Sequence, residues 1–112
     1  MEIEVRSEQQ IKVIKLRGKL GLGDPVDKLR ATLDGLVDQG HSAIILDLGE
    51  VPMIDSSGIG LLVRSLTSMK PRGGFLKLLN PTQMVQRTLK MIGLIHLFEI
   101  YDDQTKAVAS FG

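Results

Sequence analysis

The chain has 112 residues, a formal net charge of +1, no cysteine and 43% hydrophobic residues. This length suits one domain, residues 1–112, and leaves no room for a catalytic domain beside a regulatory one. A nearly neutral chain without a basic run argues against nucleic acid as a partner, and a chain without cysteine has no disulfide or thiol chemistry. No apolar run approaches the roughly 18 residues of a membrane span, and the N-terminus does not resemble a signal peptide. We therefore expect a cytoplasmic protein without direct membrane insertion.

The N-terminus is predicted to form two paired strands. Apolar and charged residues alternate over 2–6, which is typical of an edge strand with one solvent-facing side. A second strand is expected over 11–16, with residues 7–10 as the hairpin between them. Its alternation shifts between Val13 and Ile14, which indicates either two covered faces or a β-bulge.

A helix and a buried strand are predicted next. Asp24 as an N-cap and Pro25 in the first turn mark a helix start, and an apolar stripe over 26–37 continues to a stop near Gly40. Residues 43–48 then form a nearly continuous apolar run with β-branched members. Such a run is typical of a strand that is covered on both faces.

The second half of the chain repeats the pattern of helix and strand. A helix is expected from about Ser57 to Lys70, and a strand follows over 75–79. Asn80 is predicted to cap another helix, with Gln83 reaching back to it. That helix stops at Gly93, and its predicted inward residues are Val85, Leu89 and Ile92.

A short strand near 97–101 and a helix over about 103–111 complete the prediction. Connections of this length between successive strands require right-handed crossovers and parallel pairing, whereas the opening hairpin adds an antiparallel strand. The fold class is therefore α/β, with a mixed, mostly parallel sheet of about five strands and about four helices.

The most informative stretch lies where the strand at 43–48 passes into the following helix. Asp55, Ser56 and Ser57 are all residues that favour helix N-caps, and Gly58 and Gly60 keep bulk away from the helix start. The first amides of a helix tolerate a phosphate. Plain capping would explain one such residue, but it does not require three.

This stretch resembles the signature of STAS domains, and specifically that of bacterial anti-sigma-factor antagonists. In that family the serine directly after the aspartate is phosphorylated by an anti-sigma factor that is itself a serine kinase of the GHKL type. The resemblance implies that Ser56 is the phosphorylation site and that the chain is a single STAS-like domain. The segments that carry it are 46–48, Val51, 54–60, 73–78, 93–94 and 97–102.

The glycine-rich loop at 18–23 is expected at the same end of the sheet as Ser56, where it would form the second half of a binding surface. Here the chain departs from the family, because Lys19 and Gly21 stand where anti-sigma-factor antagonists often carry two acids. This difference affects which kinase recognises the chain. Asp24 is a candidate substitute for the missing acidic residues. The residues expected to bind the partner are Gly21, Leu22, Gly23, Asp24, Met53, Asp55, Ser56, Ser57, Gly58 and Ile59.

The implied mechanism is a binding switch without a cofactor. With Ser56 unmodified, the domain would bind the anti-sigma factor and so free the sigma factor. A phosphate brings about −1.5 to −2 charges into the interface and would dissociate the complex. A phosphatase is a possible further partner.

Two other functions remain open. Similar domains are non-catalytic subunits of lipid transporters or regulatory parts of anion transporters, in which the same loop would contact a permease or an ATPase. A small serine-dependent enzyme is the other alternative, but it needs a base beside the serine. The candidates are His41 and His96, neither of which has an obvious orienting partner or a neighbouring cluster of metal ligands.

Overall fold

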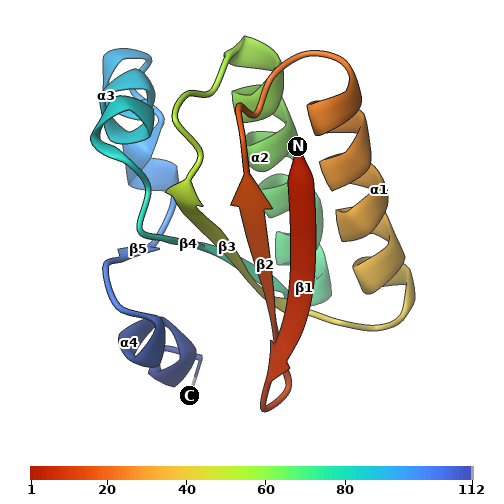
Figure 1. The fold of residues 1–112 in the computed structure, drawn as a ribbon. Helices are drawn as coiled ribbons and strands as arrows, with labels where there is room; N and C mark the ends of the chain where they lie inside the picture. Colours follow the sequence, from red (N-terminus) through yellow and green to blue (C-terminus); the bar gives the residue numbers. More distant parts are fainter. Residues whose placement is uncertain (112) are drawn as a thin grey trace.

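A computed structural model describes residues 1–111, which fold around a single five-stranded sheet (Figure 1). The strand order is β1-β2-β3-β4-β5, in which β1 and β2 are antiparallel and all other neighbours are parallel. This arrangement confirms the predicted mixed α/β sheet. The strands are β1 (Glu2–Glu8), β2 (Ile11–Arg17), β3 (Ala43–Glu50), β4 (Phe75–Leu79) and β5 (Ile100–Tyr101).

Three helices pack on one face of the sheet, and a short fourth helix covers part of the other face. The larger core lies under the first three helices, and the smaller cluster joins Ala107 of the fourth helix to Val13 and Ile45 of the sheet. The helices are α1 (Asp24–Asp38), α2 (Ser56–Met69), α3 (Gln83–Met91) and α4 (Gln104–Ala109), with 3₁₀ turns η1 (Lys70–Arg72) and η2 (Ile95–Leu97). No helix within residues 1–111 is long and apolar enough to cross a bilayer.

The shifted alternation in β2 has a structural counterpart. Val13 and Ile14 are both fully buried, and they belong to the clusters on opposite faces of the sheet. The pairing with β3 also shifts between Lys15 and Arg17, so an irregularity lies nearer the end of the strand. Burial on both faces therefore explains the shift between Val13 and Ile14, where the pairing with β3 is continuous, and the bulge predicted there is absent.

The hairpin is tighter than the predicted connection over 7–10. β1 runs to Glu8, and only Gln9 and Gln10 form the turn, with Gln9 at a positive φ of 59°. A two-residue turn keeps the register unbroken, so Ser7 pairs with Lys12 and Glu8 with Ile11.

Two predicted helix caps are wrong. Gly23, at φ 98°, is the residue before α1, so Asp24 is already helical and its carboxylate lies in the first turn. Thr82 caps α3 in place of Asn80. The backbone N–H of Asn80 donates to the carbonyl of Tyr101 at 2.8 Å, which extends the pairing of β4 with β5 beyond Leu79.

The C-terminal part differs most from the prediction. Ile92 is 51% exposed, because the chain turns at Gly93 (φ 74°) and Leu94 packs against the core in its place. Part of the strand expected at 97–101 is irregular, since η2 extends to Leu97 and regular pairing is limited to β5.

Lys77 is a buried cation beneath α4. Its side-chain amine donates to Ser110 Oγ at 2.9 Å, lies 3.4 Å from a Glu99 carboxylate oxygen and stands 4.2 Å from the centroid of the Phe111 ring. An amine that has lost water needs such partners. Lys77 thereby links β4 to the residues that directly follow α4.

Candidate functional site

The loops after β2 and β3 meet at the carboxyl end of the sheet. The Leu20 amide donates to the Met53 carbonyl at 3.1 Å, and the Asp55 amide donates to the Leu20 carbonyl at 3.2 Å. The side chains of Leu20 and Ile54 are buried beneath this contact. The expectation that the glycine-rich loop lies beside the start of α2 is therefore correct.

Asp55 connects the two loops through both oxygens of its carboxylate. Oδ1 accepts from the Gly58 amide at 3.0 Å and so caps α2, while Oδ2 accepts from the Leu22 amide at 2.9 Å. These hydrogen bonds, with Gly58 first and Leu22 second, lower the pKa of Asp55, and the positive charge of Lys19 acts in the same direction. Asp55 is thus a charged clamp at neutral pH.

Two glycines allow this close approach. A Cβ at Gly58 would lie 2.6 Å from the Leu20 carbonyl oxygen, and a Cβ at Gly21 would lie 2.9 Å from Asp55 Oδ2. An acidic side chain at position 21 would meet the Asp55 carboxylate, so glycine suits the clamp described here. The Lys19 Cε lies 3.1 Å from the same Cβ position, which places this lysine beside the clamp.

The surface around the clamp combines a hydroxyl with apolar side chains. Ser56 is the first residue of α2 and is exposed, whereas Ser57 is half-buried. Leu22 is 80% exposed and Met53 is 46% exposed, although both are large apolar residues. Such side chains at the rim of a buried junction are suited to contact another protein.

The other predicted site residues divide into a surface set and a supporting set. Gly23 and Asp24 are exposed and lie beside Leu22, and Asp55 is half-buried. Gly21, Gly58 and Ile59 are buried, so they shape the site from beneath. Leu20 is a supporting residue that the sequence analysis missed, and its position as an apolar residue between Gly18 and Gly21 is the only signal that could have identified it.

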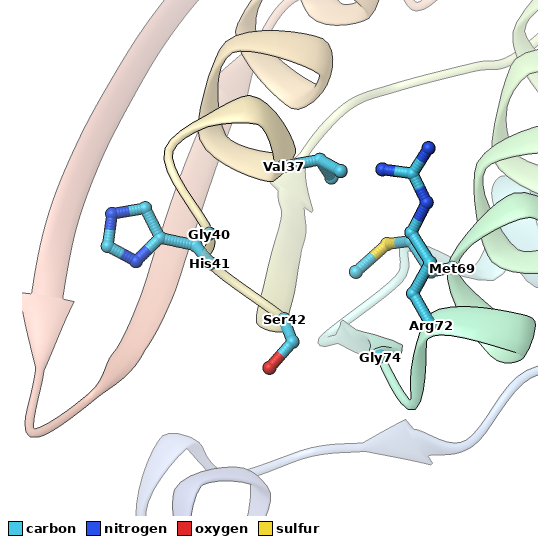
Figure 2. A pocket seen from close by; sticks show the side chains of 7 residues that line it. All are labelled: Val37, Gly40, His41, Ser42, Met69, Arg72 and Gly74. Carbon is cyan, nitrogen blue, oxygen red and sulfur yellow. The ribbon is translucent and has the colours of Figure 1, made fainter.

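The histidines lie away from Ser56. His41 lies in the loop before β3, whereas Ser56 follows the end of β3, so the two residues are at opposite ends of the sheet. His41 borders a cavity of about 200 Å³ with Val37, Met69 and Arg72, and its ring points away from the Arg72 side chain (Figure 2). His96 is exposed in η2. Within residues 1–111 no three potential metal ligands lie close enough together to hold a metal ion.

Comparison with known proteins identifies the family. The STAS domain model matches residues 2–107, so the chain belongs to the STAS domain family. A candidate anti-sigma factor antagonist from Thermotoga maritima is 35% identical over 75 residues, and the match covers 67% of this chain and 66% of the relative. The anti-sigma F factor antagonist of Paenibacillus polymyxa is 26% identical over 109 residues, which are 96% of this chain and 92% of the relative.

Solved structures show the same fold. The crystal structure of a candidate anti-sigma factor antagonist from Thermotoga maritima has a TM-score of 0.89 at 25% identity, covering 96% of this chain and 92% of the other. Phosphorylated SpoIIAA, the Bacillus cell fate determinant, has a TM-score of 0.77 at 23% identity, covering 99% and 100% of the chains. A sulfate transporter family protein from Wolinella succinogenes has a TM-score of 0.78 at 24% identity, covering 92% and 85%. The fold alone therefore does not separate regulatory from transport-associated members.

Proposed function

We propose that the chain is an anti-sigma factor antagonist whose binding is switched by phosphorylation of Ser56. In the unmodified protein, the exposed residues around the Asp55 clamp bind an anti-sigma factor in the cytoplasm, and the sigma factor is left free. We call this set the clamp surface, and it consists of Leu22, Gly23, Asp24, Met53 and Ser56. The anti-sigma factor, a serine kinase of the GHKL type, phosphorylates Ser56 and is released, and a phosphatase restores the binding form. The observation that carries this proposal is the exposed Ser56 at the first residue of α2, at a loop junction that also exposes Leu22 and Met53.

The clamp explains why the binding surface is formed before the partner arrives. Leu22 projects from a loop whose amide is held by Asp55, and Met53 belongs to the segment paired with Leu20. Binding then requires little ordering of these two loops, which reduces the entropic cost of association.

The charge of a phosphate has different consequences inside the domain and across the interface. Within the domain, the amides at the start of α2 favour an anion by about 0.3–1 kcal/mol. Across an interface formed around a neutral hydroxyl, an unpaired buried charge costs several kcal/mol. A cost of about 4 kcal/mol weakens binding roughly a thousandfold. The fold therefore survives a modification that separates the complex.

The proposal assigns no catalysis to the chain itself. Nucleophilic use of Ser56 needs a base within hydrogen-bond reach, and the two histidines lie elsewhere. His41→Ala and His96→Ala variants are accordingly expected to retain wild-type binding and phosphorylation, as measured by titration and intact mass.

The test measures the binding of the anti-sigma factor by calorimetry and the transfer of phosphate from ATP by intact mass. We expect Ser56→Ala to bind permanently without accepting phosphate, and Ser56→Asp to bind weakly. Ser68→Asp is the matched control, because Ser68 is an exposed serine near the other end of α2. Ser57→Ala is expected to retain phosphate incorporation.

Two results would contradict the proposal. If Ser56→Ala and Ser56→Asp both titrate the kinase as the wild type does, Ser56 is not the switch. Binding to a transporter permease or ATPase, without phosphate transfer, would instead support the transport alternative.

A further inference from the structure

The outer surface of α3 and the following turn is unusually apolar for a solvent-facing region. Within residues 1–111, four of the eight exposed large hydrophobic residues lie between positions 84 and 97. They are Met84 (50% exposed), Met91 (87%), Ile92 (51%) and Leu97 (46%). These residues form, with Arg87 and Lys90, what we call the α3 surface.

Helix geometry places the two methionines and the two cations of α3 on the side opposite its buried residues. Val85 and Leu89 point inward and are fully buried. Met84 and Met91 are seven residues apart, so they lie on one line about two turns, or roughly 10 Å, apart along the helix. Arg87 and Lys90 are exposed too, and at about 100° per residue they lie about 60° and 120° around the helix from Met84, to one side of the two methionines.

The two cations of the α3 surface have no carboxylate partner among residues 1–111. None of the ion pairs found there includes Arg87 or Lys90. On α1, in contrast, Arg30 pairs with Asp27 at 3.3 Å. The sequence from 83 to 98 contains no aspartate or glutamate. The positive charge beside the methionines is therefore available to a partner.

We propose that the α3 surface binds an acidic amphipathic helix of another protein. Apolar residues at positions i and i+7 of the partner helix would pack along Met84 and Met91. Carboxylates beside them on the same partner helix would pair with Arg87 and Lys90. Methionine suits this role because its flexible, polarizable side chain adapts to different apolar surfaces.

Charge and helix composition favour an acidic amphipathic helix as the partner over an anionic membrane and over a second copy of this chain. Electrostatic recognition of anionic membranes takes clusters of about 4–8 Lys and Arg, whereas the α3 surface has two. A second copy of the chain does not match either, because no helix within residues 1–111 combines exposed large apolar residues with exposed carboxylates. The acidic helix α1, for example, exposes Asp24, Asp27, Asp34 and Asp38 but no large apolar side chain.

The test uses two synthetic helical peptides of equal length, with the same leucine stripe and either glutamate or lysine beside it. Binding to the ¹⁵N-labelled protein is followed by amide chemical shifts. We expect the glutamate peptide to shift amides between 83 and 97 and to bind about tenfold more tightly than the lysine peptide.

Variants of the α3 surface sharpen the test. Met84→Gln with Met91→Gln is expected to weaken the glutamate peptide about tenfold, and Arg87→Glu with Lys90→Glu is expected to reverse the preference between the peptides. Arg64→Glu on α2 and Val5→Thr on β1 are controls that change an exposed cation and an exposed apolar residue elsewhere, and they are expected to change neither the affinity for the two peptides nor the preference between them. All these side chains are exposed, and the amide spectrum reports whether the fold is retained.

Several outcomes would overturn the proposal. These are equal affinity for both peptides, chemical shifts confined to the clamp surface, or binding to phosphatidylglycerol vesicles without binding of the glutamate peptide. A Ser56→Asp variant is expected to bind the glutamate peptide normally, so this test does not depend on the proposed switch.

Discussion

The starts of α2 and α3 show how the same local device can serve different purposes. Both helices begin after a strand from the parallel part of the sheet, and in both a side chain at the N-cap accepts from the amide three residues later. Asp55 uses a carboxylate whose second oxygen accepts from the amide of the exposed Leu22. Thr82 uses a hydroxyl that donates to the carbonyl of the buried Val51 at 3.0 Å.

The difference lies in charge and in what each cap holds. The Asp55 cap is an anion and connects α2 to an exposed loop, so it holds in place a surface that a partner protein can contact. The Thr82 cap is neutral and connects α3 to the core, so it serves the fold. Changes at the two helix starts should therefore differ in their dependence on pH and in their effect on binding.

The largest effect is expected for Gly58→Ala, which removes the space on which the α2 junction depends. The new Cβ would meet the Leu20 carbonyl oxygen at 2.6 Å and Ile54 Cγ1 at 2.8 Å. Overpacking of this kind costs about 1–3 kcal/mol. Urea unfolding measures it, with Gly60→Ala as the control, because nothing lies within 4 Å of a Cβ at Gly60. Equal stability of the two variants would show that the junction is not tight.

Asp55→Ala is expected to cost about 1–2 kcal/mol at neutral pH, because the cap is lost and the Leu22 amide is released. Amide exchange should become faster at Leu22, and binding of the anti-sigma factor should weaken. Asp55→Asn retains a capping oxygen, so its loss of stability should be smaller. Unchanged exchange at Leu22 in Asp55→Ala would argue against the clamp.

The Asp55 contribution should also depend on pH. The folded-state pKa of Asp55 lies below its ordinary value, because its carboxylate accepts from the Gly58 and Leu22 amides. A group with a lowered folded-state pKa stabilises the fold above its unfolded pKa of about 3.9 and loses this effect as the pH falls through the folded value. The stability difference between wild type and Asp55→Asn should therefore be constant from pH 7 to pH 5 and shrink below pH 4.

Thr82→Ala is expected to cost about 1 kcal/mol through the loss of the α3 cap. Because a hydroxyl does not titrate in this range, the cost should be the same at pH 7 and pH 3, which urea unfolding at both values would measure. A loss of stability that shrinks at low pH, as for Asp55, would remove the distinction between the two caps.

Ser57→Ala should have the smallest effect, within about 0.5 kcal/mol. The cap of α2 is Asp55, and Ser57 lies in the first turn. Thermal unfolding would measure the change, with Asp55→Ala as the reference for a lost cap. A loss of about 1 kcal/mol would mean that Ser57 shares the capping role.

The fold could be predicted from the sequence where one strong local pattern dominated. The apolar run at 43–48 has no competing period, and β3 covers Ala43–Glu50. Prediction failed where tertiary contacts selected among similar residues. Asn80 and Thr82 are both capping residues. The Asn80 backbone still pairs with Tyr101 at the end of β4, so α3 begins only at Gln83 and Thr82 is the residue that caps it. Ile92 fits the helical stripe, but the turn at Gly93 places Leu94 inward instead.

The candidate site could be predicted in part. Asp55 and Ser56 were identifiable because capping residues and glycines are concentrated at a strand-to-helix junction. The meeting of the two loops followed from parallel strands ending at one edge. Leu20 and the double use of the Asp55 carboxylate were not predictable, since both depend on hydrogen bonds between segments 33 or more residues apart.

The amino-acid sequence alone determined the α/β class, the order of the elements and the hydroxyl-rich start of α2, because hydrophobic period and capping preferences are local properties. Only the tertiary structure decided that Asp55 holds Leu22, that Ser56 is exposed beside apolar side chains, and that the α3 methionines face outward. These features depend on the distances between separate segments, and such distances are set by how the helices and loops pack on the sheet.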